Sequence, residues 1–274
     1  MDNMYKYISS NQNETIKQIK KIRDDGKKRD ELRQFFAEGI TLVNEIKAEL
    51  IDSIYIDEDR FEDILDKLGS DIKKNLSSDK IYKIKSSVFE NIADTKNSQG
   101  ICALVKMRSN NFDEFLKGCG NDNSRIVILE SISDPGNLGT ILRTSLAFGI
   151  SGVVLDGNCT DVYSPKVVRS SMGAIFKQNI YISNSLQDDI ATIRKMGVKV
   201  YATSPSKENS IDCESQDFSK INKLALIFGN EAHGLSDETI KNSDATLRLN
   251  ISSEIESLNV AVCASICMFV ARKK

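Results

Sequence analysis

The sequence predicts an α/β protein with a parallel sheet in its second half and a smaller α/β domain before it. Apolar runs, most of them four to six residues long, recur from residue 125 onward, and segments of helical length separate several of them. Continuous apolar runs are typical of strands buried on both faces of a parallel sheet. The predicted strands lie at 126–129, 153–155, 180–182, 198–202, 224–228 and 247–251.

The first half alternates between helical and strand-like segments. Residues 10–50 are predicted to be helical because their apolar side chains recur at helical spacing, with interruptions at Gly26 and Gly39. Beyond them we expect strands at 53–56, 81–84 and 100–105 and helices at 60–68 and 88–93. The expected organisation is a small domain at 1–108, a linker at 109–124 and a sheet domain at 125–274, which closes with an apolar helix at 258–270.

The composition suits two ordinary domains. The chain has 274 residues, of which 40% are hydrophobic and 28% charged. Its six cysteines form no C-x-x-C pair, so neither a disulfide framework nor a metal site is expected, and Cys263 and Cys267 are predicted to be core residues. Because no signal peptide or bilayer-spanning apolar run is visible, we expect a cytoplasmic protein without a membrane partner.

Charge is unevenly distributed along the chain. The formal net charge of −2 does not indicate a nucleic-acid-binding protein. Residues 17–33, however, contain eight basic side chains against four acidic ones. This stretch is either a solvated helix face with ion pairs between successive turns or a surface that contacts nucleic-acid phosphates.

Three loops at predicted strand ends carry polar residues that the fold alone does not require. Ligands of open parallel sheets bind beyond the carboxyl ends of the strands. The first loop contains Asn137 as a plausible helix N-cap, Gly139 in the first turn and Arg143 in an otherwise apolar helix. A Rossmann turn with Asp156 as the ribose-binding acid is an alternative, but the glycine pattern G-x-x-G differs from G-x-G-x-x-G.

The second and third loops follow the strands at 224–228 and 247–251. In the second, Gly229 and Gly234 flank Glu231, and His233 is more readily explained as a surface or structural residue than as a catalytic one, because no second histidine exists. In the third, Ser257 occupies an expected N-cap position. Asn259 follows within the first turn, where helix propensity does not explain it.

Together and in this order, the three loops resemble the motifs of the SpoU (TrmH-like) family of RNA 2′-O-methyltransferases, within the SPOUT superfamily. The N-terminal part, with Asn13 before a basic helix and the segment 35–39, is similar to the small substrate-binding domain, related to a ribosomal-protein fold, that many members carry. The motif residues are Asn137, Gly139 and Arg143, then Gly229, Glu231 and Gly234, then Ser257, Leu258 and Asn259.

This resemblance implies an RNA 2′-O-ribose methyltransferase that uses S-adenosylmethionine. The N-terminal domain favours ribosomal RNA over transfer RNA as the substrate. The resemblance further implies a deep trefoil knot in the sheet domain and a homodimer formed through that domain. RNA would contact the basic stretch, whose candidate RNA-binding residues are Lys17, Lys20, Lys21, Arg23, Lys27, Lys28 and Arg29.

The resemblance also implies roles for individual residues. Arg143 is the expected catalytic residue; since a guanidinium stays protonated, we favour phosphate binding and oxyanion stabilisation over the role of a base. Asn137 and Ser257 would orient Arg143 or the ribose, Glu231 would hold Arg143 by a charge-assisted bond, and Asn259 would support the loop. The expected cofactor-binding residues are Thr203, Gly229, Leu249, Ile251 and Leu258.

The third motif departs from the family pattern. It usually begins with Ile-Pro-Met and has a Gly two residues on, whereas here Asn250 and Ser253 stand in place of the Pro and the Gly. An RNA-binding module with a degenerate cofactor pocket therefore stays open as an alternative to the enzyme.

Overall fold

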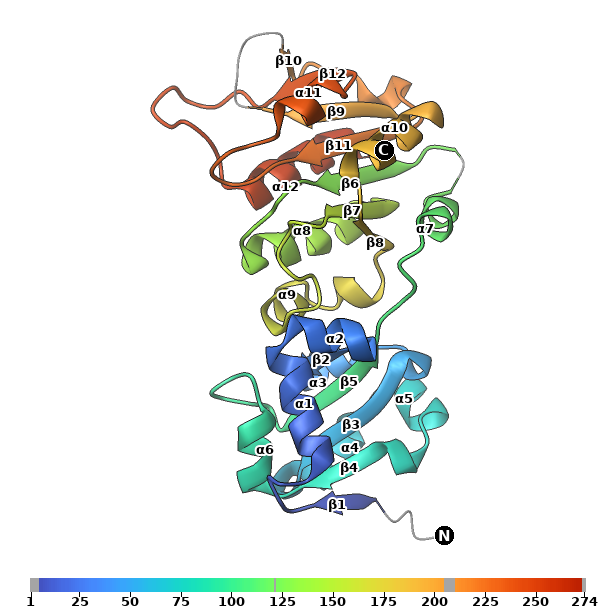
Figure 1. The fold of residues 1–274 in the computed structure, drawn as a ribbon, viewed down its shortest axis with the longest axis vertical. Helices are drawn as coiled ribbons and strands as arrows, with labels where there is room; N and C mark the ends of the chain where they lie inside the picture. Colours follow the sequence, from blue (N-terminus) through green and yellow to red (C-terminus); the bar gives the residue numbers. More distant parts are fainter. Residues whose placement is uncertain (1–4, 121, 205–209, 273–274) are drawn as a thin grey trace. The chain divides into compact units, whose positions relative to one another are not determined.

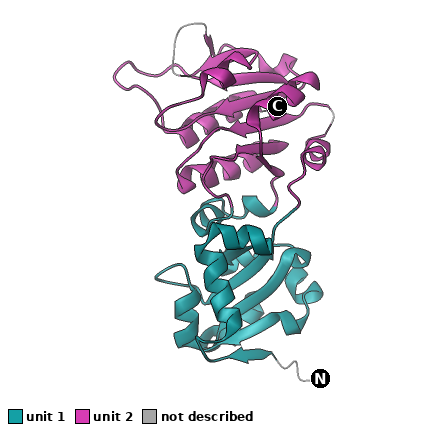
Figure 2. Cartoon of the chain, in the orientation of Figure 1, with its two compact units in different colours: residues 1–108, 163–176 teal, residues 109–162, 177–274 magenta. Residues whose placement is uncertain are grey.

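The structure, a computed structural model, describes residues 5–120, 122–204 and 210–272 (Figure 1). It divides into two compact units, one of residues 1–108 and 163–176 and the other of residues 109–162 and 177–274 (Figure 2). The segment 163–176 therefore groups with the N-terminal half, although it lies within the range predicted for the sheet domain. The domain boundaries inferred from the sequence stay a prediction.

The first unit is built around a mixed five-stranded sheet in the order β1-β4-β3-β5-β2. The strands β1, β4 and β3 are parallel, and β5 is antiparallel to both of its neighbours. The three-residue spacing of Ile16, Ile19 and Ile22 buries one face of α1 in the core. The elements are β1 (Lys6–Ile8), α1 (Glu14–Asp24), α2 (Gly26–Leu32), β2 (Gln34–Glu38), α3 (Ile40–Asn44), β3 (Ile51–Asp57), α4 (Phe61–Lys67), α5 (Ser70–Asn75), β4 (Ile81–Ile84), α6 (Ser86–Ile92), β5 (Ile101–Lys106) and α9 (Pro165–Ser170).

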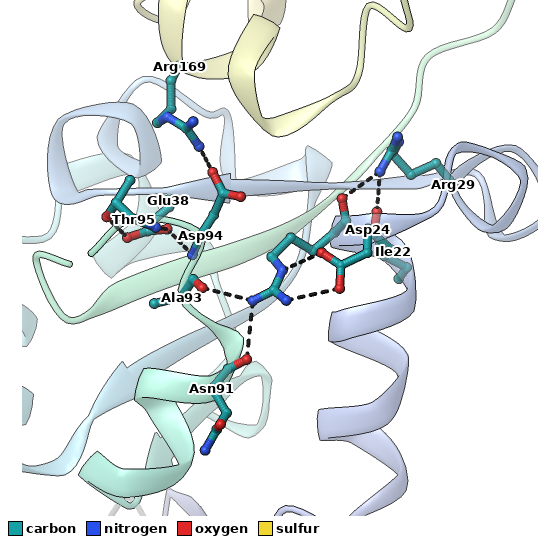
Figure 3. Close-up of polar contacts among 10 residues, drawn as sticks. Ile22, Asp24, Arg29, Glu38, Asn91, Ala93, Asp94, Thr95 and Arg169 are labelled. Carbon is teal, nitrogen blue, oxygen red and sulfur yellow. Dashed lines mark hydrogen bonds and ion pairs between the residues drawn. The ribbon is translucent and has the colours of Figure 1, made fainter. Parts of the chain in front are cut away.

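Polar and aromatic contacts join α9 and its flanks to the rest of this unit. The ring of Phe35 on β2 packs against those of Tyr163 and Phe176. Figure 3 shows Arg169 of α9 paired with Asp94, whose backbone N–H donates to Glu38 at 2.7 Å. These contacts explain why the segment 163–176 groups with the N-terminal half.

The second unit contains a seven-stranded sheet in the order β10-β12-β9-β11-β6-β7-β8, with every neighbouring pair parallel. Ile126 and Ile128 of β6 face α7 and α10. The helices α8 and α12 pack against each other (Figure 1). At their contact, Ser145 Oγ lies 3.3 Å from Met268 Sδ. The elements are α7 (Phe112–Gly118), β6 (Arg125–Leu129), α8 (Pro135–Ala147), β7 (Gly152–Asp156), β8 (Ile180–Ser183), α10 (Leu186–Lys195), β9 (Lys199–Thr203), β10 (Ser210–Asp212), β11 (Leu224–Phe228), α11 (Asp237–Lys241), β12 (Ala245–Arg248) and α12 (Val260–Ala271).

The predicted α/β class with a parallel sheet is confirmed, but two local predictions were wrong and one strand was missed. Residues 34–38 form β2 and not a helix, because Arg33 adopts a left-handed conformation (φ 52°) that ends α2, and the segment then pairs with β5. β12 ends at Arg248, so residues 249–251 lie beyond the sheet. The sequence also gave no sign of β10, whose three residues include only one apolar side chain, Ile211.

Arg125, a buried residue at the start of β6, connects the last helix to the sheet. Its guanidinium donates to the carbonyl oxygens of Ala271 (2.9 Å), Asn222 (2.8 Å) and Ile221 (2.9 Å). Burial lowers the pKa of this guanidinium, and the carbonyl partners offset the cost of burying its charge. The C-terminus of α12 is therefore fixed at the amino ends of the strands, which directs its N-terminus towards their carboxyl ends.

No helix in the described part of the chain is long and apolar enough to cross a membrane. The trefoil knot stays a prediction.

Candidate active site

The first loop leads into α8 at Asp134. Asp134 is the N-cap, with its Oδ1 accepting from the Asn137 N–H at 2.8 Å, and Pro135 occupies the first helical position. The prediction that Asn137 is the N-cap was wrong, because Asp134 offers an equally suitable capping oxygen three residues earlier. Asn137 thus lies inside the first turn, where its side-chain amide contacts the other two loops.

Glu231 joins the second loop to the first. Its Oε1 accepts hydrogen bonds from Asn137 Nδ2 (2.9 Å) and the Asp134 N–H (3.2 Å), and its Oε2 accepts from Ser133 Oγ (2.8 Å) and the Ser133 N–H (3.2 Å). Burial raises the pKa of this carboxyl, but hydrogen bonds, chiefly from Asn137 and Ser133, outweigh that effect and lower the pKa to about 2. Glu231 is therefore ionised at neutral pH.

The expected bond between Glu231 and Arg143 is absent from the described part of the chain, because the carboxylate is occupied by Ser133, Asp134 and Asn137. Arg143 lies six residues beyond Asn137 on α8, with its side chain exposed. Among the described residues it has no hydrogen-bond or ion-pair partner. An exposed, unpaired guanidinium is well suited to binding a phosphate.

The third loop reaches Asn137 through Asn259. The Nδ2 of Asn259 donates to Asn137 Oδ1 at 3.0 Å, and its Oδ1 accepts from the N–H groups of Ala261 (2.9 Å) and Val262 (3.3 Å). Asn259 is therefore the N-cap of α12, and the prediction that Ser257 is the cap was wrong. The side chains of Glu231, Asn137 and Asn259 form one continuous hydrogen-bonded chain across the three loops.

A cleft of about 610 Å³ lies beside this chain, at the carboxyl ends of β9, β11 and β12. This volume is typical of small-molecule sites. Two of the residues discussed above, Glu231 and Asn259, line the cleft, and Ser257 does so as well. The predicted cofactor-binding residues line it too: Thr203, Gly229, Leu249, Ile251 and Leu258.

Two features of the backbone shape this cleft. A Cβ added to Gly229 would come within 2.4 Å of the carbonyl carbon and oxygen of Gly234, so only glycine fits there. In the described part of the chain, the backbone N–H and C=O groups of Leu249 and Ile251 have no hydrogen-bond partner. Such groups require partners when they are covered, and a polar ligand edge can provide them.

Two family models match this chain. The model of the SpoU rRNA Methylase family matches residues 124–269, and that of the MRM3-like substrate binding domain matches residues 13–103. The chain belongs to the SpoU rRNA methylase family. The resemblance inferred from the three motifs is thereby confirmed, together with the enzyme class of RNA methyltransferase and an N-terminal substrate-binding domain.

Relatives of this SpoU-family chain match it along nearly its whole length. The 23S rRNA (guanosine(2553)-2′-O)-methyltransferase RlmP of Bacillus subtilis (strain 168) is 28% identical over 269 residues, which cover 97% of this chain and 99% of that protein. The crystal structure of an AdoMet-bound rRNA methyltransferase from Sinorhizobium meliloti matches with a TM-score of 0.82 and 30% identity, covering 97% of each chain. The SpoU methyltransferase AviRb from Streptomyces viridochromogenes, at 20% identity and a TM-score of 0.79 over 94% of this chain and 96% of its own, shows the shared fold.

S-adenosylmethionine, the expected cofactor, is the methyl donor of the SpoU family. The cleft suits it in size and in the backbone groups of Leu249 and Ile251, which have no hydrogen-bond partner among the described residues. Leu258 adds an apolar side chain to the lining of the cleft. The individual residue assignments stay predictions.

The sequence reasoning missed several residues at this cleft. Asn230 shapes the second loop: its Nδ2 donates to the Ser131 carbonyl at 2.7 Å, and its Oδ1 accepts from the N–H of Ala232 at 2.9 Å. Its position between two glycines in a turn was the available signal. Cys263 and Cys267, predicted to be core residues, also line the cleft; Cys267 is buried and Cys263 is half-buried. His233 lines it too and is exposed, which agrees with a surface position.

The seven basic residues expected to bind RNA fall into different classes. Arg29 is only 5% exposed, and its Nη1 donates to the carbonyl oxygens of Ile22 and Arg23, both at 2.7 Å (Figure 3). Its assignment to RNA binding was wrong, because its guanidinium is buried at the junction of α1 and α2 and donates to these two carbonyl oxygens. The guanidinium of Arg23 is likewise engaged, by Asp24 and the carbonyls of Asn91 and Ala93.

The five lysines differ in their pairing. Lys17 forms an ion pair with Glu14 at 2.8 Å, and Lys28 forms one with Glu31 at 2.5 Å. Each pair is separated by three residues along its helix, as the ion-paired interpretation of this stretch expects. In the described part of the chain, no hydrogen-bond or ion-pair partner meets the side chains of the other three lysines: Lys20, Lys21 and Lys27.

Proposed function

We propose that this SpoU-family enzyme methylates the 2′-hydroxyl of one ribose in ribosomal RNA. The observation that carries the proposal is the hydrogen-bonded chain of Glu231, Asn137 and Asn259, of which Glu231 and Asn259 line the cleft. Arg143 lies on the same helix as Asn137. Ribosomal RNA is preferred to transfer RNA because residues 13–103 match a substrate-binding domain model and because the full-length relative RlmP acts on 23S rRNA.

The reaction requires a positioned hydroxyl and a means of stabilising negative charge on its oxygen. S-adenosylmethionine supplies the activated methyl group. Arg143, which remains protonated, binds a substrate phosphate and stabilises the developing oxyanion. Asn137, held in one orientation by Glu231 and Asn259, positions the ribose together with Ser257. Thr203, Gly229, Leu249, Ile251 and Leu258 hold the cofactor.

The partners follow from surface features of each unit. Residues 1–108 bind RNA, with Lys20, Lys21 and Lys27 as the unpaired contacts and Lys17 and Lys28 as the paired ones, and residues 125–274 carry the reaction. The enzyme works in the cytoplasm. It forms a homodimer, because a second copy would bury the exposed apolar side chains on α8 and α12. These side chains are Leu146, Val262, Ile266 and Phe269. Sedimentation equilibrium measures this association.

The test combines a cofactor titration with one variant. Calorimetric titration of S-adenosylmethionine should give one site per chain, and Arg143→Ala should abolish methylation of ribosomal RNA while cofactor binding persists. Lys195→Ala, which removes an exposed cation from α10, is the matched control and should leave turnover unchanged. Near-normal turnover of Arg143→Ala would disprove the role of this residue. Methylation of transfer RNA alone would change the substrate, and RNA binding without cofactor binding would indicate a degenerate module.

A further inference from the structure

Asn250, which replaces the usual proline of the third motif, is tied by its side chain to two neighbouring strands. Its Nδ2 donates to Asp212 Oδ2 at 2.6 Å, and its Oδ1 accepts from Arg248 Nη1 at 2.5 Å. The third side of the triangle is an ion pair between Arg248 Nη2 and Asp212 Oδ2 at 3.9 Å. Both the NH₂ group and the oxygen of the Asn250 amide are therefore hydrogen-bonded, and the opposite charges of Asp212 and Arg248 offset each other.

The two partners of Asn250 are themselves fixed by the sheet. Asp212 and Arg248 are the last residues of β10 and β12, and they lie opposite each other in the parallel register. The N–H of Cys213 donates to the Arg248 carbonyl at 2.8 Å, which extends this pairing by one bond. The side chains of Asp212 and Arg248 are 18% and 21% exposed, so they are more rigid anchors than free surface groups.

Asn250 stands between two residues that line the cofactor cleft. Leu249 and Ile251 face the cleft, whereas Asn250 is absent from its wall and bonds to β10. The side chain of Asn250 and the cleft-lining parts of its two neighbours therefore lie on different sides of this segment. Anchoring Asn250 on one side fixes Leu249 and Ile251 on the cleft side, where their backbone groups have no hydrogen-bond partner among the described residues.

We propose that Asn250 is a positioning residue that holds the cofactor-binding segment 249–251 in place by its bonds to Asp212 and Arg248. A proline restrains the backbone through its fixed φ. In this chain, hydrogen bonds from the Asn250 side-chain amide to Asp212 on the edge strand β10 and to Arg248 restrain the same segment. The substitution thus preserves the geometry of the site and is not a sign of a degenerate pocket. This inference rests on the proposed cofactor site.

The experiment compares variants of the full chain by calorimetric titration with S-adenosylmethionine and by steady-state kinetics with ribosomal RNA. Asn250→Ala should raise the Kd and the KM for the cofactor about tenfold, as expected for loss of one or two hydrogen bonds, with kcat at saturating cofactor within about twofold of wild type. Asp212→Ala should have a similar effect, and the double variant should be no worse than either single one. Asn250→Pro should recover most of the affinity.

Glu254→Ala is the matched control, since Glu254 is exposed on the same loop and its side chain has no partner in the described part of the chain. Thermal melts of each variant verify that the fold is intact. Unchanged cofactor affinity of Asn250→Ala, additive effects of the two alanine variants, or no recovery with Asn250→Pro would each overturn the inference. Absence of cofactor binding by the wild-type protein would instead overturn the proposed function.

Discussion

Replacing Glu231 with glutamine tests the hydrogen-bonded chain at the cleft, because it removes the charge and keeps the shape of the side chain. Glu231 presents two acceptor oxygens, one to the Ser133 N–H and one to the Asp134 N–H. A glutamine has one oxygen and one NH₂ group. Whichever way the amide turns, its NH₂ group faces a backbone N–H, so at least one of these bonds is lost in Glu231→Gln.

The stability effect of this substitution depends on pH in a defined direction. Lowering the carboxyl pKa from 4.5 to about 2 corresponds to about 3 kcal/mol, which solvent screening of an exposed side chain reduces to about 1 kcal/mol. Because the folded pKa lies below the ordinary value, this stabilisation is fully present above pH 4.5 and is lost as the pH falls towards about 2. Glutamine does not titrate, so the difference in unfolding free energy should shrink over that range.

Urea denaturation of the wild type and Glu231→Gln at several pH values measures this difference. We expect about 1 kcal/mol near neutral pH and a smaller value below about pH 4. The kcat should also fall about tenfold to a hundredfold, since Asn137 loses a charge-assisted bond of about 1.5–3 kcal/mol. Glu254→Gln is the control, as a carboxylate with no hydrogen bonds in the described part of the chain. Equal stability of wild type and variant at neutral pH, or a difference that does not change with acidity, would refute the reasoning.

Two further predictions address the cofactor cleft and the RNA surface. Gly229→Ala should lower the affinity for S-adenosylmethionine more than about tenfold and lower the Tm by several degrees, because the new Cβ meets the Gly234 backbone at 2.4 Å. Calorimetry and thermal melts measure these two effects. Gly157→Ala is the control and should change neither quantity, because the nearest atom to its new Cβ is 3.4 Å away. Replacing Lys20, Lys21 and Lys27 by alanine should reduce the slope of log Kd against log salt by about 2–3 for a ribosomal RNA fragment, whereas Lys67→Ala, which removes a lysine paired with Asp63, should leave the slope unchanged in filter-binding assays.

Long apolar runs made the central part of the fold predictable. The strands β6, β7 and β11 are almost entirely buried, and each contains an uninterrupted apolar run, at 126–129, 153–155 and 224–228, that marks its position. The segment 34–38 lacked such a signal, since Phe35 and Phe36 fit a helical spacing as well as a strand and only the pairing with β5 decides between them. The edge strand β10 is defined by its bonds to β12 and not by its composition.

The charge of the basic stretch was visible in the sequence, but its distribution between fold and surface was not. Arg29 and Lys28 are neighbours with the same formal charge, yet one guanidinium is buried on two carbonyl oxygens and the other side chain pairs with Glu31 at the surface. That difference arises where α1 meets α2 and the carbonyls of Ile22 and Arg23 lack helical partners. Local periodicity contains no information on which cation meets those carbonyls.

For the asparagines of the site, too, the sequence did not reveal which partner each side-chain atom would meet. Ser257 and Asn259 are both good N-caps, so propensity could not choose between them. Asn259 must accept from the first N–H groups of α12 and also donate to Asn137 Oδ1, 122 residues away in the sequence. An aspartate could cap the helix but has no hydrogen to donate. Only an amide of this length meets both demands, and the second demand becomes visible once α8 and α12 are placed side by side.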